Sequence, residues 1–297
     1  MKLLKQIFNI ILWISLGMAL MPSLTRAEKN MQAQLAIPVE TSQVSEQEIN
    51  ETLSFVGDIK ALDETILYSK VKGKLIEYKV KEGEKVDKDM TIALVDRDEV
   101  GFKYENAPVI ATISGTLGRN YLDRGSDIDV DTPVTLIVNL ESVRAVISVV
   151  ERHIPQIHLG QKAYIYTEAY PEAFEGTIWK ISPVVEPQTR SAPVEVIIQN
   201  PQHQLLPGMF AKVKVIISTN PHALVIPEES IVSIEGKNFV FVVEDSVARR
   251  RKVTLGVRQP GLVEITEGLQ KGETIVKAGH QKLHDGTMVS MINNNTE

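Results

Sequence analysis

A pair of histidines is the first feature of this chain whose spacing could support chemistry. His280 and His284 stand four residues apart, which on a helix would place both imidazoles on one face, where they could hold a metal ion. Gly279 and Gly286 bracket the pair and the flanking segments have strand character, so we interpret it as a surface pair on a loop. No Ser-His-Asp order, paired-carboxylate site or phosphate-binding glycine loop stands out elsewhere. The sequence therefore predicts neither an enzyme nor a bound metal or cofactor.

Methionines are a second candidate for metal chemistry, because thioethers bind soft metals such as Cu(I). Met209, Met288 and Met291 do not cluster with one another or with Met31. We interpret them as core residues, with a metal-binding protein as an alternative that titration with Cu(I), Ag(I) or Zn(II) would test.

A basic run is the clearest charge feature. Arg249, Arg250 and Arg251 precede Lys252 in a chain whose formal net charge is −6. One interpretation is the solvated edge of a hairpin, where cations discourage strand-to-strand aggregation. The other is an electrostatic contact with a partner protein.

The elements that must position such residues are organised around a repeat in residues 71–138. A shift of 42 residues superposes the two copies without a gap, with these identities: Gly73 and Gly115, Leu75 and Leu117, Gly83 and Gly125, Asp87 and Asp129, Asp89 and Asp131, Leu94 and Leu136. Apolar residues alternate in short runs interrupted by glycines, which predicts short strands and not a helix. Each half is too small to bury its apolar face alone, so we expect the two to close into a small β-sandwich.

The repeat resembles a lipoyl or biotinyl domain. The pattern V-x-G-x-L followed by V-x-x-G-x-x-V carries the resemblance, although Asp89 and Asp131 replace a usual glycine. In carrier domains the hairpin between the halves presents a lysine for covalent attachment. Here Glu99 occupies the expected tip. Lys103 is the nearest lysine, but the residues next to it do not match those that flank the attachment lysine of carrier domains. We therefore interpret the unit as a structural module, with a cofactor carrier as the alternative.

The segment 1–27 has the character of a secretory signal peptide. Lys2 and Lys5 precede an apolar run from Ile7 to Leu20, and Thr25-Arg26-Ala27 is a small-residue cleavage site. The run is shorter than the roughly 20 residues of a spanning helix. We expect cleavage, with an uncleaved inner-membrane anchor as the alternative. The chain has no cysteine, so export brings neither disulfides nor a lipid-modified cysteine.

Charge limits the classes of partner. Removal of the signal segment would take away three cations and no acid, so the formal charge would change from −6 to −9. This balance argues against nucleic acid or an anionic membrane surface as the main partner.

The remaining segments predict an all-β chain with one short helix at 151–157, in which Pro155 would have to lie in the first turn. Strands are expected on both sides of the repeat: two or three short ones within 36–65, and single strands at 143–150, 163–167, 174–181, 191–198, 209–217, 224–227, 231–234, 239–243, 250–255, 263–265, 274–276 and 288–291. Turn residues separate them, including Asn220-Pro221 after the strand that ends near Ile217. Their even spacing suggests a small antiparallel barrel and a second all-β unit.

An ordered series of motifs resembles the periplasmic adaptor proteins, or membrane fusion proteins, of resistance-nodulation-division efflux pumps. It runs through Leu140 to Ala145, Val150-Glu151-Arg152, Phe174-Glu175-Gly176, Ile181-Ser182-Pro183, Thr189-Arg190, Leu206 to Met209, Val253 to Gly256 and Leu283 to Gly286. Single motifs of this kind are weak, but their order is specific and covers nearly all of the chain after the signal segment. Two of them, Pro207-Gly208-Met209 and Thr189-Arg190, have a local interpretation as turn geometry and an alternative one as subunit or pump contacts.

The resemblance implies a nested, elongated and mainly β architecture. We expect a signal peptide at 1–27, a membrane-proximal β domain at 36–52 plus 221–292, a β-barrel domain at 53–64 plus 141–220 and a lipoyl-like domain at 65–140. Typical adaptors insert a long α-helical hairpin between the lipoyl halves. Here only the segment 96–108 is available. Divided into two antiparallel helical arms of about five residues and a turn, it would project roughly 8 Å. The chain thus resembles an adaptor without the hairpin.

The resemblance implies a non-enzymatic function in the periplasm, in association with the inner membrane. The expected partners are an inner-membrane efflux transporter, an outer-membrane channel protein and further copies of the chain in a ring, as a trimer or hexamer. An adaptor for an ABC-type exporter is the alternative. The transported substrate cannot be inferred from the sequence.

Overall fold

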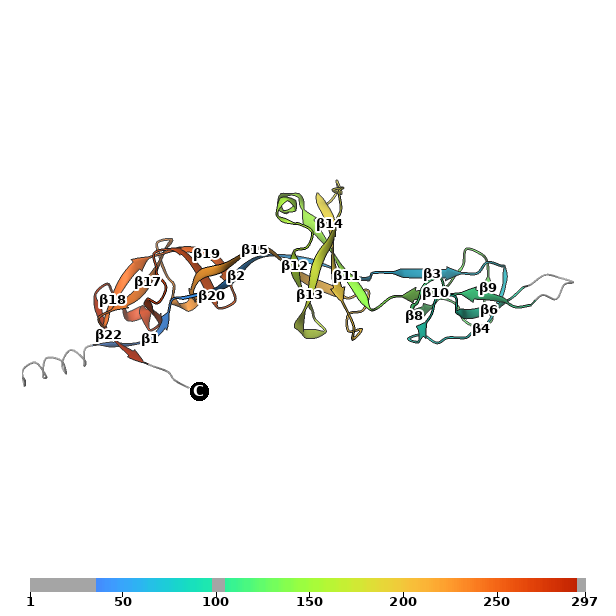
Figure 1. Cartoon of the computed structure of the whole chain (residues 1–297), viewed down its shortest axis with the longest axis horizontal. Helices are drawn as coiled ribbons and strands as arrows, with labels where there is room; N and C mark the ends of the chain where they lie inside the picture. Colours follow the sequence, from blue (N-terminus) through green and yellow to red (C-terminus); the bar gives the residue numbers. More distant parts are fainter. Residues whose placement is uncertain (1–35, 98–104, 293–297) are drawn as a thin grey trace, which may run out of the picture. The chain divides into compact units, whose positions relative to one another are not determined.

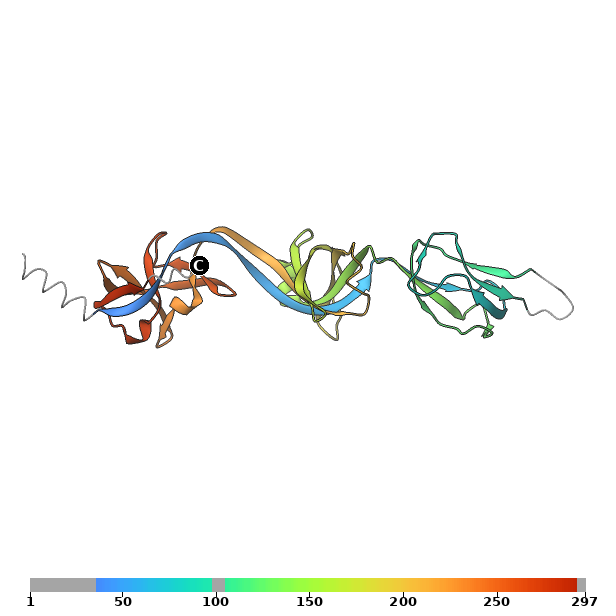
Figure 2. The ribbon, with the colours of Figure 1, turned by 90° about the horizontal axis from the view of Figure 1, so that it is seen from below.

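The computed structural model describes residues 36–97 and 105–292 (Figure 1). Contacts divide the chain into two compact units, Met1–Glu51 with Ser218–Glu297 and Thr52–Ile217. Two long strands, β2 (Ser45–Ala61) and β15 (Phe210–Pro227), each contribute to both units and are neighbours in one sheet. Figure 2 shows them as the blue and orange ribbons.

The repeat folds into two four-stranded sheets within the second unit. Their strands are β3 (Glu64–Tyr68), β4 (Gly73–Tyr78), β5 (Lys85–Val86), β6 (Thr91–Asp96), β7 (Ala107–Ile110), β8 (Gly115–Asn120), β9 (Asp127–Ile128) and β10 (Pro133–Val138). The sheet orders are β3-β10-β8-β5 and β7-β6-β4-β9. The shift that aligns the two copies in the sequence also superposes β4, β5 and β6 on β8, β9 and β10 at both ends of every strand. The sheets enclose one apolar core, which confirms the predicted sandwich.

Each half lends a two-residue strand to the sheet of the other. β4 pairs with β9 and β8 pairs with β5. The turns that make this exchange contain Gly83 and Gly125, whose φ angles are 86° and 92°. Gly83 N–H donates to Leu117 O and Gly125 N–H to Leu75 O, both at 2.8 Å. The positive φ that glycine permits at these turns therefore serves the interlocking of the halves.

Two further glycines allow close approach of neighbouring strands. A Cβ added at Gly73 would lie 1.9 Å from Asp96 O, and one at Gly115 would lie 2.5 Å from Val138 O. No side chain fits at either distance. These glycines are conformationally ordinary, and their role is steric.

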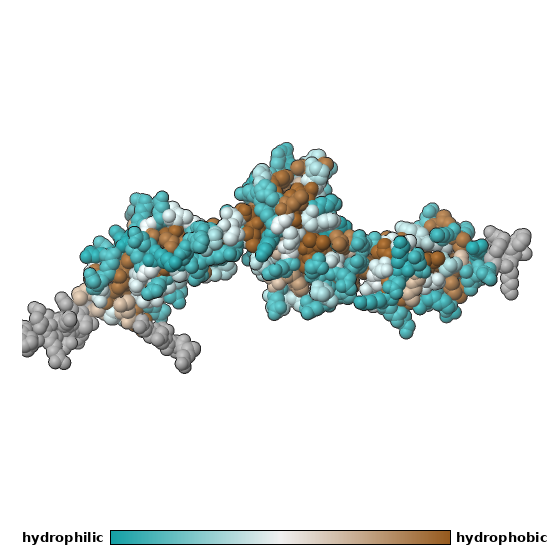
Figure 3. All heavy atoms as spheres, viewed as in Figure 1, coloured by the Kyte–Doolittle hydropathy of each residue, from teal (hydrophilic) through white to brown (hydrophobic). Residues whose placement is uncertain are grey.

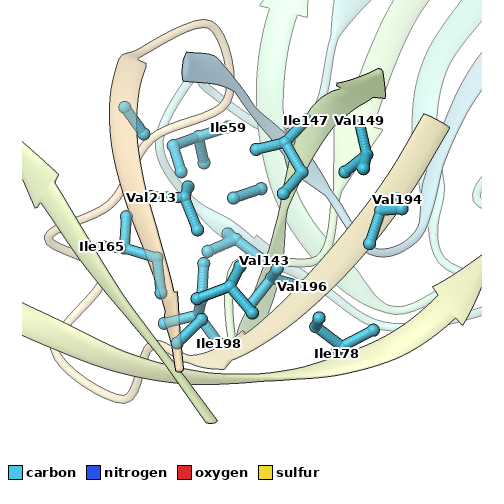
Figure 4. Close-up of a cluster of buried hydrophobic side chains, with 14 of the residues drawn as sticks. Ile59, Val143, Ile147, Val149, Ile165, Ile178, Val194, Val196, Ile198 and Val213 are labelled. Atoms are coloured by element: carbon cyan, nitrogen blue, oxygen red, sulfur yellow. The ribbon is translucent and has the colours of Figure 1, made fainter. Parts of the chain in front are cut away.

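The barrel is the remaining part of the second unit. Its strands are β11 (Ser142–Val150), β12 (Lys162–Thr167), β13 (Tyr170–Ile181) and β14 (Ser191–Gln199), with parts of β2 and β15. The sheet order β12-β13-β14-β11-β2-β15 closes on itself because β12 also pairs with β15. Figure 4 shows the β-branched side chains that fill the interior, among them Ile147, Ile165 and Val196, all fully buried.

Two local expectations for this region are corrected. Residues Glu151–Gln156 form a 3-10 helix with Pro155 as its fifth residue and not in the first turn. Val150 and Ile157 flank this helix in extended conformation, and only Ile157 is buried. The predicted break at Asn220-Pro221 is also wrong, since β15 continues through it. Proline's φ suits an extended strand at an exposed position.

The first unit is built on a six-stranded sheet. Its strands are β1 (Ile37–Gln43), β16 (Val232–Ile234), β17 (Lys237–Glu244), β18 (Val247–Lys252), β21 (Thr274–Ala278) and β22 (Thr287–Ile292), in the order β16-β17-β18-β22-β1-β21. An additional β17–β21 pairing closes it. β19 (Thr254–Gln259) and β20 (Leu262–Glu267) extend the barrel sheet beyond β15. Short 3-10 helices occupy Glu228–Ser230 and His280–Lys282. In residues 36–97 and 105–292, no helix has the length and apolar character that crossing a membrane requires.

Candidate functional site

The connection between the two lipoyl-like halves is short. β6 ends at Asp96 and β7 begins at Ala107, so only the segment 97–106 joins them. Glu99 and Lys103, the residues relevant to a carrier role, lie outside the described part of the chain. A segment of this length is too short for a long helical hairpin.

One tyrosine ties the lipoyl-like halves together. The Tyr78 hydroxyl donates from β4 to Leu122 O at 3.0 Å or Val134 O at 3.1 Å, both in the second half. Burial raises the pKa of this phenol. Asp89 differs from its counterpart Asp131 because only Asp89 has a positive φ, 69°. The positive φ that a glycine would favour at this position is thus present in the first half, at Asp89, and absent in the second, at Asp131.

Thr189 and Arg190 close the loop between β13 and β14. Arg190 has a φ of 49°, and its N–H donates to Glu186 O at 2.8 Å while its carbonyl accepts from Glu151 N–H at 3.1 Å. The Thr189 hydroxyl lies 2.8 Å from the Ser191 hydroxyl. These bonds account for the motif as a turn and attach it to the 3-10 helix. They use backbone and hydroxyl groups, and leave the Arg190 guanidinium without an ion pair in the described chain.

Pro207, Gly208 and Met209 form a turn that enters β15 against β2. Gly208 has a φ of 95° and donates to Ile59 O at 2.8 Å, while Ile59 donates to Met209 O at 2.8 Å. Met209 packs on the barrel core, in agreement with its interpretation as a core residue, but the same interpretation is wrong for Met291, which is 54% exposed. The neighbouring Phe210 is 58% exposed.

The barrel surface carries several large apolar side chains that are exposed. They are Val150, Leu159, Trp179, Val184 and Val185, which are between 37% and 66% exposed. Trp179 is the extra residue of a β-bulge, because Ile178 pairs with Val196 and Lys180 with Glu195. Bulges redirect side chains. Figure 3 shows hydrophobic residues on the barrel surface among hydrophilic ones.

The basic run lies on β18 beyond the residues that pair with β22. Arg251 binds the carboxylates of Glu244 and Glu273, and the Arg250 guanidinium stands 5.2 Å from the centre of the Phe239 ring. Arg249 and Lys252 make no ion pair within the described residues. Arg250 and Arg251 therefore have partners within the fold, whereas Arg249 and Lys252 are available to a partner protein.

An ion-pair cluster on the outer face of the barrel was also not predicted. Glu195 on β14 accepts from Arg144 at 2.9 Å and from Lys180 at 3.1 Å. Burial opposes the ionisation of Glu195, but the hydrogen bonds from Lys180 and Arg144 outweigh it and hold the pKa below its ordinary value. The three residues come from adjacent strands and are far apart in sequence, so no local pattern signals them.

The metal-ligand candidates do not assemble. His280 begins a three-residue 3-10 helix and His284 follows it, so the pair does not share the face of an α-helix. In the described ranges no group of three or more His, Cys, Asp or Glu side chains is placed to hold a metal ion. Of the predicted contact residues, Thr189, Arg190 and the turn at Pro207 belong to the second unit, and the basic run belongs to the first.

Comparisons with known proteins agree with this architecture. Residues 142–218 match the family model of the CusB-like β-barrel domain, and residues 223–291 match the C-terminal permuted SH3-like domain of YknX. Multidrug resistance protein MdtA of Xenorhabdus bovienii is 24% identical over 205 residues, covering 66% of this chain and 50% of MdtA. Cation efflux system protein CzcB of Alcaligenes sp. is 25% identical over 162 residues, covering 54% of this chain and 31% of CzcB. The chain thus spans half or less of the length of these curated relatives.

Solved structures share the fold. MacA from Actinobacillus actinomycetemcomitans has a TM-score of 0.56 at 15% identity, covering 80% of this chain and 99% of the MacA chain. ZneB from Cupriavidus metallidurans has a TM-score of 0.51 at 15% identity, covering 83% of this chain and 94% of ZneB. With its doubled sandwich, its closed barrel and both matching domain models, the chain resembles the membrane fusion proteins, the periplasmic adaptors of efflux pumps.

Proposed function

We propose that this protein is a non-enzymatic periplasmic adaptor that links an inner-membrane resistance-nodulation-division transporter to an outer-membrane duct. The observation that carries the choice of transporter is the match of residues 142–218 to the CusB-like β-barrel domain, a barrel model assigned to this class of pump. The curated relatives are named for multidrug resistance and cation efflux, which supports export as the process. The adaptor would act mechanically, by passing conformational state between pump and duct through differential contacts.

The proposed cellular location is the periplasm, next to the inner membrane. The charged and apolar pattern of residues 1–27 supports export, and cleavage after Ala27 would release residues 28–297. N-terminal sequencing of the purified protein tests this: a first residue of Glu28 indicates cleavage, and a first residue of Met1 indicates a retained anchor.

The proposed pump contacts use residues that the fold leaves available. Arg249 and Lys252 offer cations without an ion pair in the described part of the first unit, and the loop carrying Thr189 and Arg190 offers exposed apolar residues beside a guanidinium. The exposed Trp179 would contribute to contacts between copies in a ring. Charge pairs of this kind guide association and are weakened by salt.

The proposed outer contact is made by the lipoyl-like rim itself, because the segment 97–106 is too short to form a long helical arm. Tyr121 and Val130 supply exposed apolar groups on this part of the chain. Contact by a rim would be short-range, so the duct or an accessory protein must approach it directly.

The test is cross-linking in intact cells from photoreactive phenylalanine placed at Val130 or Trp179, with the captured proteins identified by mass spectrometry. We expect an outer-membrane channel or its accessory protein from Val130, and a proton-driven pump or a second copy from Trp179. Capture of an ABC ATPase complex from Trp179 would overturn the pump class. The same inner-membrane protein from both positions would overturn the division of contacts.

A charge reversal tests the basic contact separately. Arg249→Glu with Lys252→Glu is expected to weaken pump binding at low salt, whereas Lys70→Glu with Lys88→Glu changes the same charge on the lipoyl-like part and should not. Equal binding by both double variants and the natural protein would rule out this contact.

A further inference from the structure

The barrel contains a ligand-sized hollow that its adaptor role does not use. It measures about 530 Å³ and lies within the second unit. One wall is the first half of β13, and the other is the end of β14 with the connection that follows it. Figure 1 labels β13 and β14 in the barrel. Ligand pockets in proteins are commonly about 300–1,000 Å³, so the volume suits a small organic molecule.

Two aromatic rings form the apolar part of the hollow. The centres of the Tyr170 and Phe174 rings are 5.7 Å apart at an interplanar angle of 81°. Both side chains are half-buried, and Phe174 also packs on the barrel core, which fixes its position. Ring faces attract cations, and the attraction is stronger for organic ammonium groups that shed water easily.

The charge of the lining is negative. Glu172 and Glu175 both border the hollow, and neither makes an ion pair or side-chain hydrogen bond in the described chain. No Lys, Arg or His lines it among residues 36–97 and 105–292. Elsewhere on the barrel, by contrast, Glu195 is bound by two cations.

Amides complete the lining and stiffen one wall. Asn200 is 2% exposed, and its side chain donates to Leu140 O and Leu205 O while accepting from Leu205 N–H. These bonds hold the connection after β14 in place. Gln202 and Gln204 line the hollow from the same connection and form no side-chain hydrogen bond within the described residues, so their amide groups are available to a ligand.

We propose that this hollow binds a small organic cation, such as a quaternary or alkyl ammonium compound. The carboxylates repel anions, and the aromatic pair favours a cation with apolar substituents. A metal ion fits less well, because no group of three or more candidate ligands is placed to hold one in the described residues. The site is independent of the pump and duct contacts proposed above.

The test is ligand-observed NMR titration of the purified full chain with choline and with 3,3-dimethylbutan-1-ol, which has the same shape without the charge. Choline is expected to bind more tightly and to weaken as salt rises. Glu172→Gln and Glu175→Gln should each weaken choline about 2- to 5-fold. Glu168→Gln removes the same charge from the adjacent turn, outside the lining, and should leave binding unchanged.

Ring variants separate cation binding from a general effect of charge. Tyr170→Leu is expected to weaken choline about 2- to 5-fold, while Tyr170→Phe keeps the ring face and should not. Equal binding of choline and the neutral alcohol would overturn the proposal, as would an equal loss in Glu168→Gln. Tighter binding of N-acetyl-arginine methylamide than of choline would also overturn it, because the hollow would then suit a cationic side chain of a protein. Circular dichroism of each variant checks that the barrel is intact.

Discussion

Replacement of Gly73 by alanine tests the steric reason for the glycine pairs of the lipoyl-like repeat. The added Cβ would lie 1.9 Å from Asp96 O. Real Cβ atoms essentially never approach another heavy atom closer than 3.0 Å, so the overlap is about 1.1 Å. β4 and β6 must therefore separate at one end of the strand pair, where β4 begins at Gly73 and β6 ends at Asp96, beside a core that is closed. Overpacking of this kind costs about 1–3 kcal/mol, and the size of the overlap places Gly73→Ala near the upper end.

Two matched variants set the scale. At Gly115 the corresponding distance is 2.5 Å, so Gly115→Ala requires a smaller displacement. At Gly83 nothing lies within 4 Å of the added atom, but its φ of 86° is strained for alanine and costs about 1–2 kcal/mol. We expect Gly73→Ala to be more destabilising than Gly115→Ala. Gly83→Ala should act only through its strained φ, since the added atom meets no neighbour.

Native-state hydrogen exchange followed by mass spectrometry is the suitable assay, because it reports the free energy of opening for each segment. For Gly73→Ala we expect amides of β4 and β6 to exchange roughly 30- to 150-fold faster, which corresponds to about 2–3 kcal/mol. Barrel amides should be unchanged, since the barrel has a separate core. Wild-type exchange in β4 of Gly73→Ala, or a larger effect at Gly83 than at Gly73, would refute the steric argument.

The other predictions concern single side chains. Tyr78→Phe should lower the opening free energy of the lipoyl-like part by about 1 kcal/mol in the same exchange assay, because the hydroxyl joins its two halves. Since the folded pKa of Glu195 is depressed, its contribution to barrel stability should be complete above the ordinary glutamate pKa, about 4.3, and be lost as pH falls through the folded value. Urea midpoints followed by Trp179 fluorescence should show this acid dependence, and an unaltered dependence in Lys180→Met would contradict it. Arg251→Met should destabilise the first unit by roughly 1 kcal/mol or less in urea denaturation because two partly exposed carboxylates lose their partner, whereas Arg249→Met should not.

The lipoyl-like part was largely predictable because its information is local. The shift that aligns the two copies in the sequence reproduces the strand boundaries of both halves, and the glycines at 83 and 125 mark turns that only a positive φ can make. The all-β class and the family resemblance followed from similar short patterns. The 3-10 helix that contains Pro155 and the continuation of β15 through Pro221 were not predicted. A sequence pattern treats proline as a break, although extended and 3-10 backbones can accommodate it.

The candidate surfaces were less predictable, because exposure and pairing depend on distant segments. The basic run was visible in the sequence, but only the fold assigns Arg251 to two carboxylates and leaves Arg249 without an ion pair among the described residues. The hollow beside Tyr170 and Phe174 had no sequence signal, since its second wall comes from the connection after β14, which is not a neighbour of these rings in the sequence.

The sequence by itself determined the strand periodicity, the doubled unit, the short connection between its halves and the family resemblance. Only the tertiary structure decided how the halves exchange β5 and β9, how β12 closes the barrel onto β15, and which charged groups of the described chain pair with one another. The physical reason is the range of the interactions. Turn conformation and alternation are set by neighbouring residues, whereas strand partners, burial and ion pairs are chosen by free energy summed over segments that meet only in the fold.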